Sequence, residues 1–144
     1  MLFNFKDVTY FVKDVYITGG ELRKISLPSI ILYCGYTNSN QNPGYMCDST
    51  KMKPIIIWQY TVEGEGVLEY QGRKKILLKP GSLLFLTSFS KFRYYPSQNP
   101  KGWEFIFVCM GGKQSIQMSK QIISQYGPVN YLRQNSLSLK TANE

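Results

Sequence analysis

Short apolar runs alternate with turn residues through the middle of the chain. Each run has the length of a β-strand, and each turn contains glycine or proline. The runs are 67–70, 76–78 and 83–86, and the turns before them are Gly64-Glu65-Gly66, Gln71-Gly72-Arg73 and Lys79-Pro80-Gly81. This spacing is typical of antiparallel strands in sandwiches and small barrels. It predicts an all-β body with three consecutive hairpins, in which Pro80-Gly81 forms a type II turn.

Two longer apolar segments flank this region. Residues 55–62 are β-branched and aromatic almost without interruption, which predicts a strand covered on both faces. Residues 103–108 predict a second strand, on which alternation places Trp103, Phe105 and Phe107 on one face.

The pattern changes from strand to helix after Gly112. Ser115 predicts the N-cap of a short amphipathic helix, and Gly127-Pro128 predicts its end. We therefore expect three regions, which are an N-terminal arm with leading strands at 1–53, a barrel core at 54–112, and the helix with the start of a linker at 113–144.

Composition places the chain among single globular domains. Its 144 residues, 43% of them hydrophobic, suffice for one core without disulfide or metal staples. The three cysteines form no close pair, and neither a secretory signal nor an apolar run of bilayer length occurs. These features predict a reduced, cytoplasmic protein without a membrane segment.

The net charge of +8 raises the question of a polyanion partner. The single tight basic cluster, Arg73-Lys74-Lys75, directly follows a turn, which favours a solvated surface over a binding patch. No nucleic-acid-binding motif accompanies it.

The absence of histidine limits the chemistry that the chain can perform. Without an imidazole base, a Ser-His-Asp or Cys-His arrangement is impossible, and the usual histidine ligands for iron, manganese or zinc are missing. No phosphate-binding Walker loop or dinucleotide fingerprint occurs either. The sequence predicts a domain without catalytic activity, metal or cofactor.

The order of the turns and strands resembles a known family. Gly64-Glu65-Gly66, Gln71-Gly72-Arg73, Leu78-Lys79-Pro80-Gly81, Phe92-Arg93-Tyr94 and Trp103-Glu104-Phe105 follow one another. This order, over about residues 54–132, resembles the N-terminal cupin domain of arabinose-type (AraC/XylS) transcriptional regulators. Many members carry histidine where Phe92 stands, so the resemblance implies no metal site here.

The resemblance implies a sensor domain of a bacterial regulator. It implies a cupin-like double-stranded β-barrel (jelly roll) followed by one short C-terminal α-helix, which binds a small-molecule effector and forms a homodimer. Promoter DNA would be bound by a helix-turn-helix domain that this chain lacks. Sugars or related polar metabolites are the favoured effectors by family association.

Candidate effector contacts follow from the same resemblance. Its cavity is bordered by Trp103, Phe105 and Phe107, with Tyr94 supplied by an adjacent turn, and aromatic rings can stack on a sugar or another flat ligand. These rings can equally fill the barrel. On residues 55–62 and just beyond, strand alternation gives Gln59, Thr61 and Glu63 a common face. Glu63 occupies a position where the arabinose sensor has an effector-contacting arginine, and both a ligand contact and an exposed turn charge remain open for it.

The predicted dimer interface lies on the helix, with Ile116, Ile122 and Ile123 as its candidates. The first fifty residues contain Tyr10, Tyr16, Tyr33, Tyr36 and Tyr45. Most of these tyrosines are expected in the core or on strand surfaces, and one or two are expected to close over the cavity.

Two alternative functions remain. The barrel is closed and serves dimerisation alone, or the domain is a sugar-modifying cupin enzyme.

Overall fold

The computed structural model describes residues 28–52, 55–72 and 75–133. The predictions for Tyr10 and Tyr16 lie outside these residues. The strands are β1 (Ile30–Asn38), β2 (Cys47–Asp48), β3 (Ile56–Gly64), β4 (Gly66–Tyr70), β5 (Ile76–Leu78), β6 (Ser82–Thr87), β7 (Phe92–Pro96), β8 (Trp103–Gly111) and β9 (Val129–Tyr131). The helical elements are α1 (Lys113–Tyr126) and the 3-10 turns η3 (Ser39–Gln41) and η4 (Ser49–Lys51).

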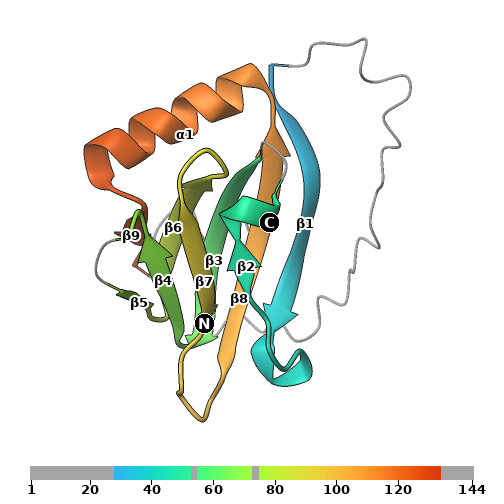
Figure 1. Cartoon of the computed structure of the whole chain (residues 1–144), viewed down its shortest axis with the longest axis vertical. Coiled ribbons are helices and arrows are strands. Elements are labelled where there is room, and N and C mark those ends of the chain that lie inside the picture. The colour runs from blue at the N-terminus through green and yellow to red at the C-terminus, as the bar shows by residue number, and fades with distance from the viewer. Residues whose placement is uncertain (1–27, 53–54, 73–74, 134–144) are drawn as a thin grey trace.

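The strands form two antiparallel sheets that face each other (Figure 1). The five-stranded sheet has the order β1-β8-β3-β6-β9, and the four-stranded sheet has the order β2-β7-β4-β5. The predicted all-β body with one C-terminal helix is confirmed. Both β1 and β2 come from the region expected to lead into the barrel, and they pair with β8 and β7 as full members of the sheets.

The prediction of three consecutive hairpins is wrong. Of the three turns, only the one at Gln71-Gly72 joins two paired strands, β4 and β5. The turns at Gly64–Gly66 and Pro80-Gly81 carry the chain from one sheet to the other. The Pro80-Gly81 turn itself has the expected form, since Gly81 has φ +91° and the Ser82 N–H bonds the Lys79 carbonyl at 2.9 Å. Turn residues specify a chain reversal, but they do not specify whether the two strands pair.

The core lies between the sheets, where alternate residues of each strand point inward. Strand register places the inner-face residues of the five-stranded sheet in rows across it. Gln59 of β3 pairs with Leu84 of β6 and with Phe107 of β8, and Phe107 pairs with Gly35 of β1. The fully buried members of the core include Leu68, Leu78, Trp103 and Phe105.

Gly66 allows the closest approach in the core. A Cβ at this position would lie 2.4 Å from Cε2 of Trp103, so the indole packs directly on the β4 backbone. The Trp103 ring is fully buried, and its Nε1 donates to Thr61 Oγ1 at 3.2 Å. The glycine pattern that predicted a turn therefore also makes room for the tryptophan predicted on the later strand.

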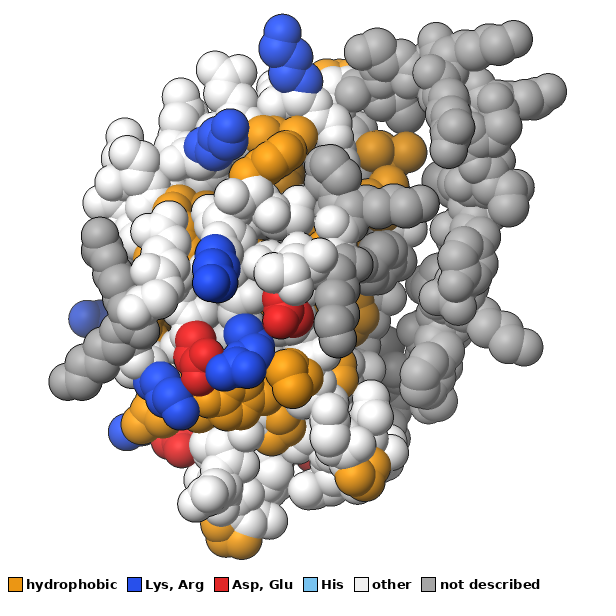
Figure 2. All heavy atoms as spheres, in the orientation of Figure 1, with side chains coloured by type: hydrophobic (Ala, Val, Ile, Leu, Met, Phe, Trp, Pro, Cys, Tyr) orange, Lys and Arg blue, Asp and Glu red, His pale blue; other side chains and the backbone are white. Residues whose placement is uncertain are grey.

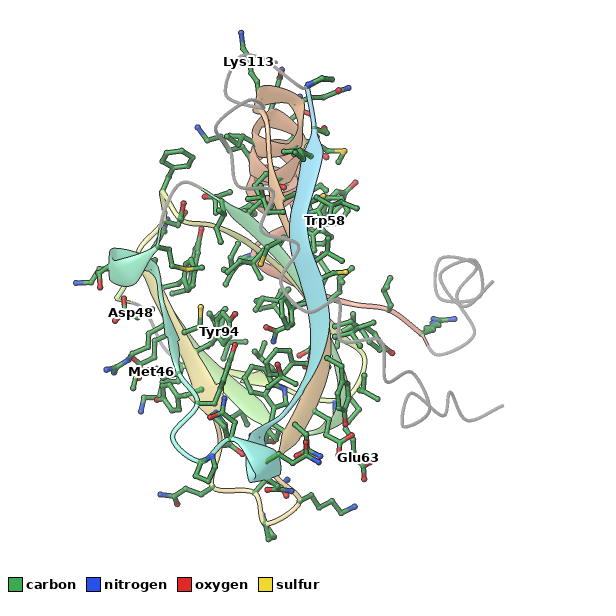
Figure 3. All side chains as sticks on the ribbon, turned by 90° about the vertical axis from the view of Figure 1, so that its right-hand side faces the viewer. Met46, Asp48, Trp58, Glu63, Tyr94 and Lys113 are labelled. Carbon is green, nitrogen blue, oxygen red and sulfur yellow. The ribbon has the colours of Figure 1, made fainter. Side chains whose placement is uncertain are left out.

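A β-bulge interrupts β3 between Thr61 and Glu63. Because side chains alternate along a strand, one extra residue moves everything beyond it to the opposite face. Gln59 and Thr61 are buried, whereas Glu63 is exposed. The expectation that all three share a face is wrong. Figure 3 shows Tyr94 between the sheets and Glu63 on the opposite side of the five-stranded sheet.

Helix α1 packs on the outer face of the five-stranded sheet through small side chains (Figure 1). Ser119 is fully buried and accepts a hydrogen bond from Trp58 Nε1 at 3.1 Å. Ser115, predicted as the N-cap, lies inside the first turn and bonds Ser29 Oγ at 2.8 Å. Gly112, with φ +102°, is the actual N-cap. Glycine is needed there because a Cβ would lie 2.6 Å from the Pro28 carbonyl oxygen.

The predicted helix end is confirmed. Gly127 has φ +80°, and its N–H bonds the Ile123 carbonyl at 2.9 Å. No helix in the described part of the chain is long and apolar enough to cross a membrane.

Candidate effector-binding site

The interior between the two sheets contains polar side chains but no charge. Every buried polar residue within the described ranges is serine, threonine or glutamine. The buried polar residues closest in register to the aromatic strand β8 are Gln59 and Thr61. Thr61 is paired through its hydroxyl with the Trp103 indole, as noted above.

Gln59 is the least satisfied side chain of the interior. It is 1% exposed, and neither its Nε2 nor its Oε1 has a hydrogen-bond partner among the described residues. Its cross-strand neighbours Leu84 and Phe107 can offer none. A buried amide without a partner costs about 1–3 kcal/mol. Natural interiors contain few such groups, and each calls for an explanation.

Aromatic rings form a continuous cluster beside this amide. The ring of Phe105 lies 4.4 Å from Trp103, 6.1 Å from Phe107 and 5.5 Å from Tyr45, measured between centroids. Trp103 and Phe105 have no exposed surface, whereas Phe107 is half-buried. The predicted common face of these three β8 residues is therefore the inner one. Trp103 and Phe105 fill the core, and Phe107 reaches its margin over Gly35, where a Cβ would be 3.1 Å from the Phe107 ring.

Tyr94 faces the cluster from the four-stranded sheet. It lies on β7 rather than on a turn, which corrects the expectation, and it pairs with Cys47 of β2. Its ring is edge-on to Trp103 at 5.8 Å and stacks on Phe92 at 5.9 Å. Phe92 is buried and completes the apolar wall.

Tyr45 is a candidate site residue that the sequence did not single out from the other tyrosines. It lies between η3 and β2, and its ring approaches both Phe105 and Tyr94. Burial raises the pKa of Tyr45 to about 12 and the pKa of Tyr94 well above its usual value. Both hydroxyls are protonated at neutral pH, as tyrosines ordinarily are, and they interact with each other and with the Cys47 thiol, whose pKa burial also raises. Only the fold, which carries this loop over the sheet edge, distinguishes Tyr45.

Glu63 belongs to a different cluster, on the outer face of the five-stranded sheet. It pairs in register with Glu104, which accepts hydrogen bonds from Tyr36 Oη at 2.6 Å and Asn38 Nδ2 at 2.7 Å. Burial and the bond to Glu104 raise the pKa of Tyr36 to about 12. In this structure Glu63 does not line the interior.

Charged side chains gather on the outer surface of the four-stranded sheet (Figure 2). Glu69 accepts from Arg93 at 2.7 Å and lies 3.5 Å from the Lys75 ammonium group. The hydrogen bond from Tyr95, together with Arg93, lowers the pKa of Glu69. Lys75 is thus a solvated, paired surface charge, and Arg73 and Lys74 of the predicted cluster lie outside the described residues. Over those residues, no group of three or more His, Cys, Asp or Glu side chains is placed to hold a metal ion.

The residues of α1 that are predicted at a dimer interface are half-buried, namely Ile116, Ile122 and Ile123. More fully exposed apolar side chains on the helix are Met118 and Tyr126.

Two facing antiparallel sheets that enclose aromatic rings and uncharged polar groups define the class of double-stranded β-barrel domains. The family model described as the AraC-like ligand binding domain matches residues 35–138, and the chain belongs to this family. Its members are cupin-type effector-binding domains of AraC family regulators. The resemblance found in the sequence is therefore confirmed.

Solved structures of oxalate decarboxylase from Bacillus subtilis show weak similarity. A structure from work on its Mn(II) centres has 15% identity and a TM-score of 0.32, with 82% of this chain and 45% of that chain covered. The enzyme at pH 4.6 has 15% identity and a TM-score of 0.31, with 81% of this chain and 44% of that chain covered. A serine-to-alanine mutant has 16% identity and a TM-score of 0.33, with 82% of this chain and 45% of that chain covered. The chain spans less than half of that enzyme's length. A search of curated proteins found no match.

Proposed function

We propose that the domain binds a small-molecule effector between its two sheets and, as part of a transcription regulator, changes that regulator's activity when occupied. The observation that supports this most is the amide of Gln59, which is buried in the interior with both polar atoms unpaired among the described residues. In a ligand-binding family, a buried polar group that gains a hydrogen-bond partner only from the bound ligand is expected to be a contact residue.

The contact residues that we propose combine predicted and newly found positions. Gln59 supplies hydrogen bonds, Phe107 and Tyr45 supply movable aromatic surface at the margin of the core, and Tyr94 supplies a protonated hydroxyl. Thr61, Trp103 and Phe105 support them from behind, since their polar atoms are paired or their rings are fully buried.

The domain acts in our proposal as a sensor without catalytic activity. A histidine-free chain lacks the usual proton-transfer base at neutral pH, and the interior tyrosines are protonated there, with burial raising their pKa further. Regulation of transcription requires contact with promoter DNA, which we assign to a further part of the regulator. Because promoter DNA of a bacterial regulator lies in the cytoplasm, we also propose a cytoplasmic location for the protein.

Homodimerisation through α1 remains a prediction, with Ile116, Ile122 and Ile123 as its proposed contacts. Each is half-buried in the single chain, so each retains some surface for a second copy. A two-fold axis across the helix would bring the same residues of both copies together.

A thermal-shift screen tests the proposed function. The 144-residue chain is heated with neutral ring amides, monosaccharides, sugar acids and polyamines, and a ligand that binds only the folded state raises the Tm. The substitutions Tyr94→Phe and Phe107→Ala should reduce the response, while Phe89→Ala, at an exposed turn position outside the core, should leave it unchanged. If no compound changes the Tm, the closed barrel becomes the better explanation, and the complete burial of Trp103 and Phe105 favours that alternative.

A further inference from the structure

We infer that the effector is an uncharged, planar ring compound with an adjacent hydrogen-bond donor and acceptor, such as a lactam or ring amide, whose edge pairs with the side chain of Gln59. The inference rests on the effector-binding function proposed above. It replaces the sugar favoured by family association with a ligand class drawn from the interior itself.

The lack of charged side chains in the described interior disfavours ionic ligands. No Asp, Glu, Lys or Arg is among the buried residues of the described ranges. A carboxylate, phosphate or ammonium group placed there would lose its hydration without gaining a countercharge, which is strongly unfavourable. The nearest interior hydroxyls, on Tyr45 and Tyr94, are neutral at pH 7 as in any tyrosine, and burial raises their pKa further. A neutral ligand is therefore favoured over sugar acids and polyamines.

The number of unpaired polar atoms argues against a sugar. Three buried side-chain atoms of the described residues lack a hydrogen-bond partner, namely Gln59 Nε2, Gln59 Oε1 and Ser82 Oγ. A pyranose carries about five hydroxyl groups, each of which is both donor and acceptor. Most of them would be buried without partners among aromatic rings. A ligand with one donor and one acceptor uses the Gln59 amide completely and leaves few polar groups of its own unpaired.

The geometry around Gln59 favours a flat ring. A primary amide presents an N–H donor and a carbonyl acceptor side by side, which is complementary to the N–H and C=O of a lactam. Phe107 is the direct cross-strand neighbour of Gln59, and its ring extends over Gly35, where the missing Cβ leaves the aromatic face close to the backbone. A planar ligand held by the amide would lie against this aromatic surface, and offset stacking adds to its affinity.

Entry of the ligand requires a side chain to move, because both amide atoms are closed off from solvent. Tyr45 is the candidate. It lies between Gly44, which has φ +80° and where an added Cβ would meet no atom within 4 Å, and Met46, which is 55% exposed. The strands next to it, β1 and β2, are edge strands of different sheets, and Figure 3 views the molecule from this side. Rotation of the Tyr45 ring would disturb no sheet hydrogen bond.

Calorimetric and thermal-shift titrations test the inference on the 144-residue chain. The ring amides are uracil and 2-pyridone, and 1,3-dimethyluracil is the control whose N–H groups are blocked. Arabinose, glucose, benzoate and spermidine represent the other classes. The variants are Gln59→Met, which keeps the shape of the side chain, and Gln59→Leu as a second apolar replacement. Gln117→Leu, at an exposed position of α1, is the matched control.

We expect at least one ring amide to raise the Tm by about 5 °C or more at saturation. The response should disappear in both Gln59 variants, persist in Gln117→Leu and be absent with 1,3-dimethyluracil. Binding that survives in folded Gln59→Met would overturn the role of Gln59. Binding of sugars or ions without any ring amide would overturn the ligand class while the proposed function stands. A lack of binding in every class would count against both.

Discussion

The substitution Gly66→Ala should destabilise the domain through a single steric contact. The new Cβ would lie 2.4 Å from Cε2 and 2.6 Å from Cδ2 and Cζ2 of Trp103, whereas carbon atoms pack best at about 3.5–4.0 Å. The indole would have to retreat by roughly 1 Å. It cannot do so freely, since Phe105 lies 4.4 Å away and Tyr94 5.8 Å away between ring centroids. Overpacking of this kind costs about 1–3 kcal/mol, and loss of the bond from Trp103 to Thr61 adds about 1 kcal/mol.

The expected loss of about 2–4 kcal/mol is a large part of the 5–15 kcal/mol typical of a folded domain. Urea unfolding followed by far-ultraviolet circular dichroism measures it. Gly72→Ala is the control, because Gly72 has φ +66° but a Cβ added there would meet no described atom within 4 Å, so alanine costs only the backbone strain of about 1–2 kcal/mol. A Gly66→Ala variant that is as stable as the native chain, or more stable than Gly72→Ala, would refute the steric argument.

Three further predictions concern the interior and the helix. Without ligand, Gln59→Met should raise the free energy of unfolding by about 1–2 kcal/mol in urea titrations, because an unpaired amide is removed; a loss of stability would indicate that the amide is already paired, for example by buried water. The free energy of unfolding of the native chain should fall as the pH rises from about 10 to about 12. The pKa of Tyr45 is about 12 in the folded state and about 10 in the unfolded state, so the unfolded state loses this proton at lower pH. Urea titrations across this range should show a smaller fall for Tyr45→Phe, and an identical fall would exclude Tyr45 as a cause. If α1 forms the dimer interface, glutamates at Ile122 and Ile123 should give monomers in sedimentation, and a variant that is folded by circular dichroism yet still dimeric would remove that interface.

Local sequence signals predicted the strands and turns well, because glycine and proline act through the backbone at their own positions. Gly81 and Gly127 adopt the positive φ angles that their turns require. The pairing of strands depends on contacts between distant residues, which no local signal contains. Two of the three predicted hairpins therefore became crossings between sheets.

The candidate site was predictable only where strand alternation holds. It placed Trp103, Phe105 and Phe107 on one face correctly, but the bulge after Thr61 turned Glu63 outward. No residue type in β3 marks this bulge in advance. Tyr45 was equally hard to recognise, since the resemblance was found in the sequence over residues 54–132 only, whereas the family model covers residues 35–138. Tyr45 approaches Phe105 from sixty residues away only through the fold.

The two tryptophans of the chain lie on opposite faces of the five-stranded sheet, so their fluorescence reports on two separate parts of the domain. Trp103 is buried beside the proposed site, and Trp58 bonds Ser119 of α1 (Figure 3). Indole fluorescence depends on local polarity, so Trp58→Phe leaves an emission that responds to the barrel interior, and Trp103→Phe leaves one that responds to helix docking. Comparison of the two emissions during a titration would separate an effector that is merely bound from one whose binding is transmitted to the helix.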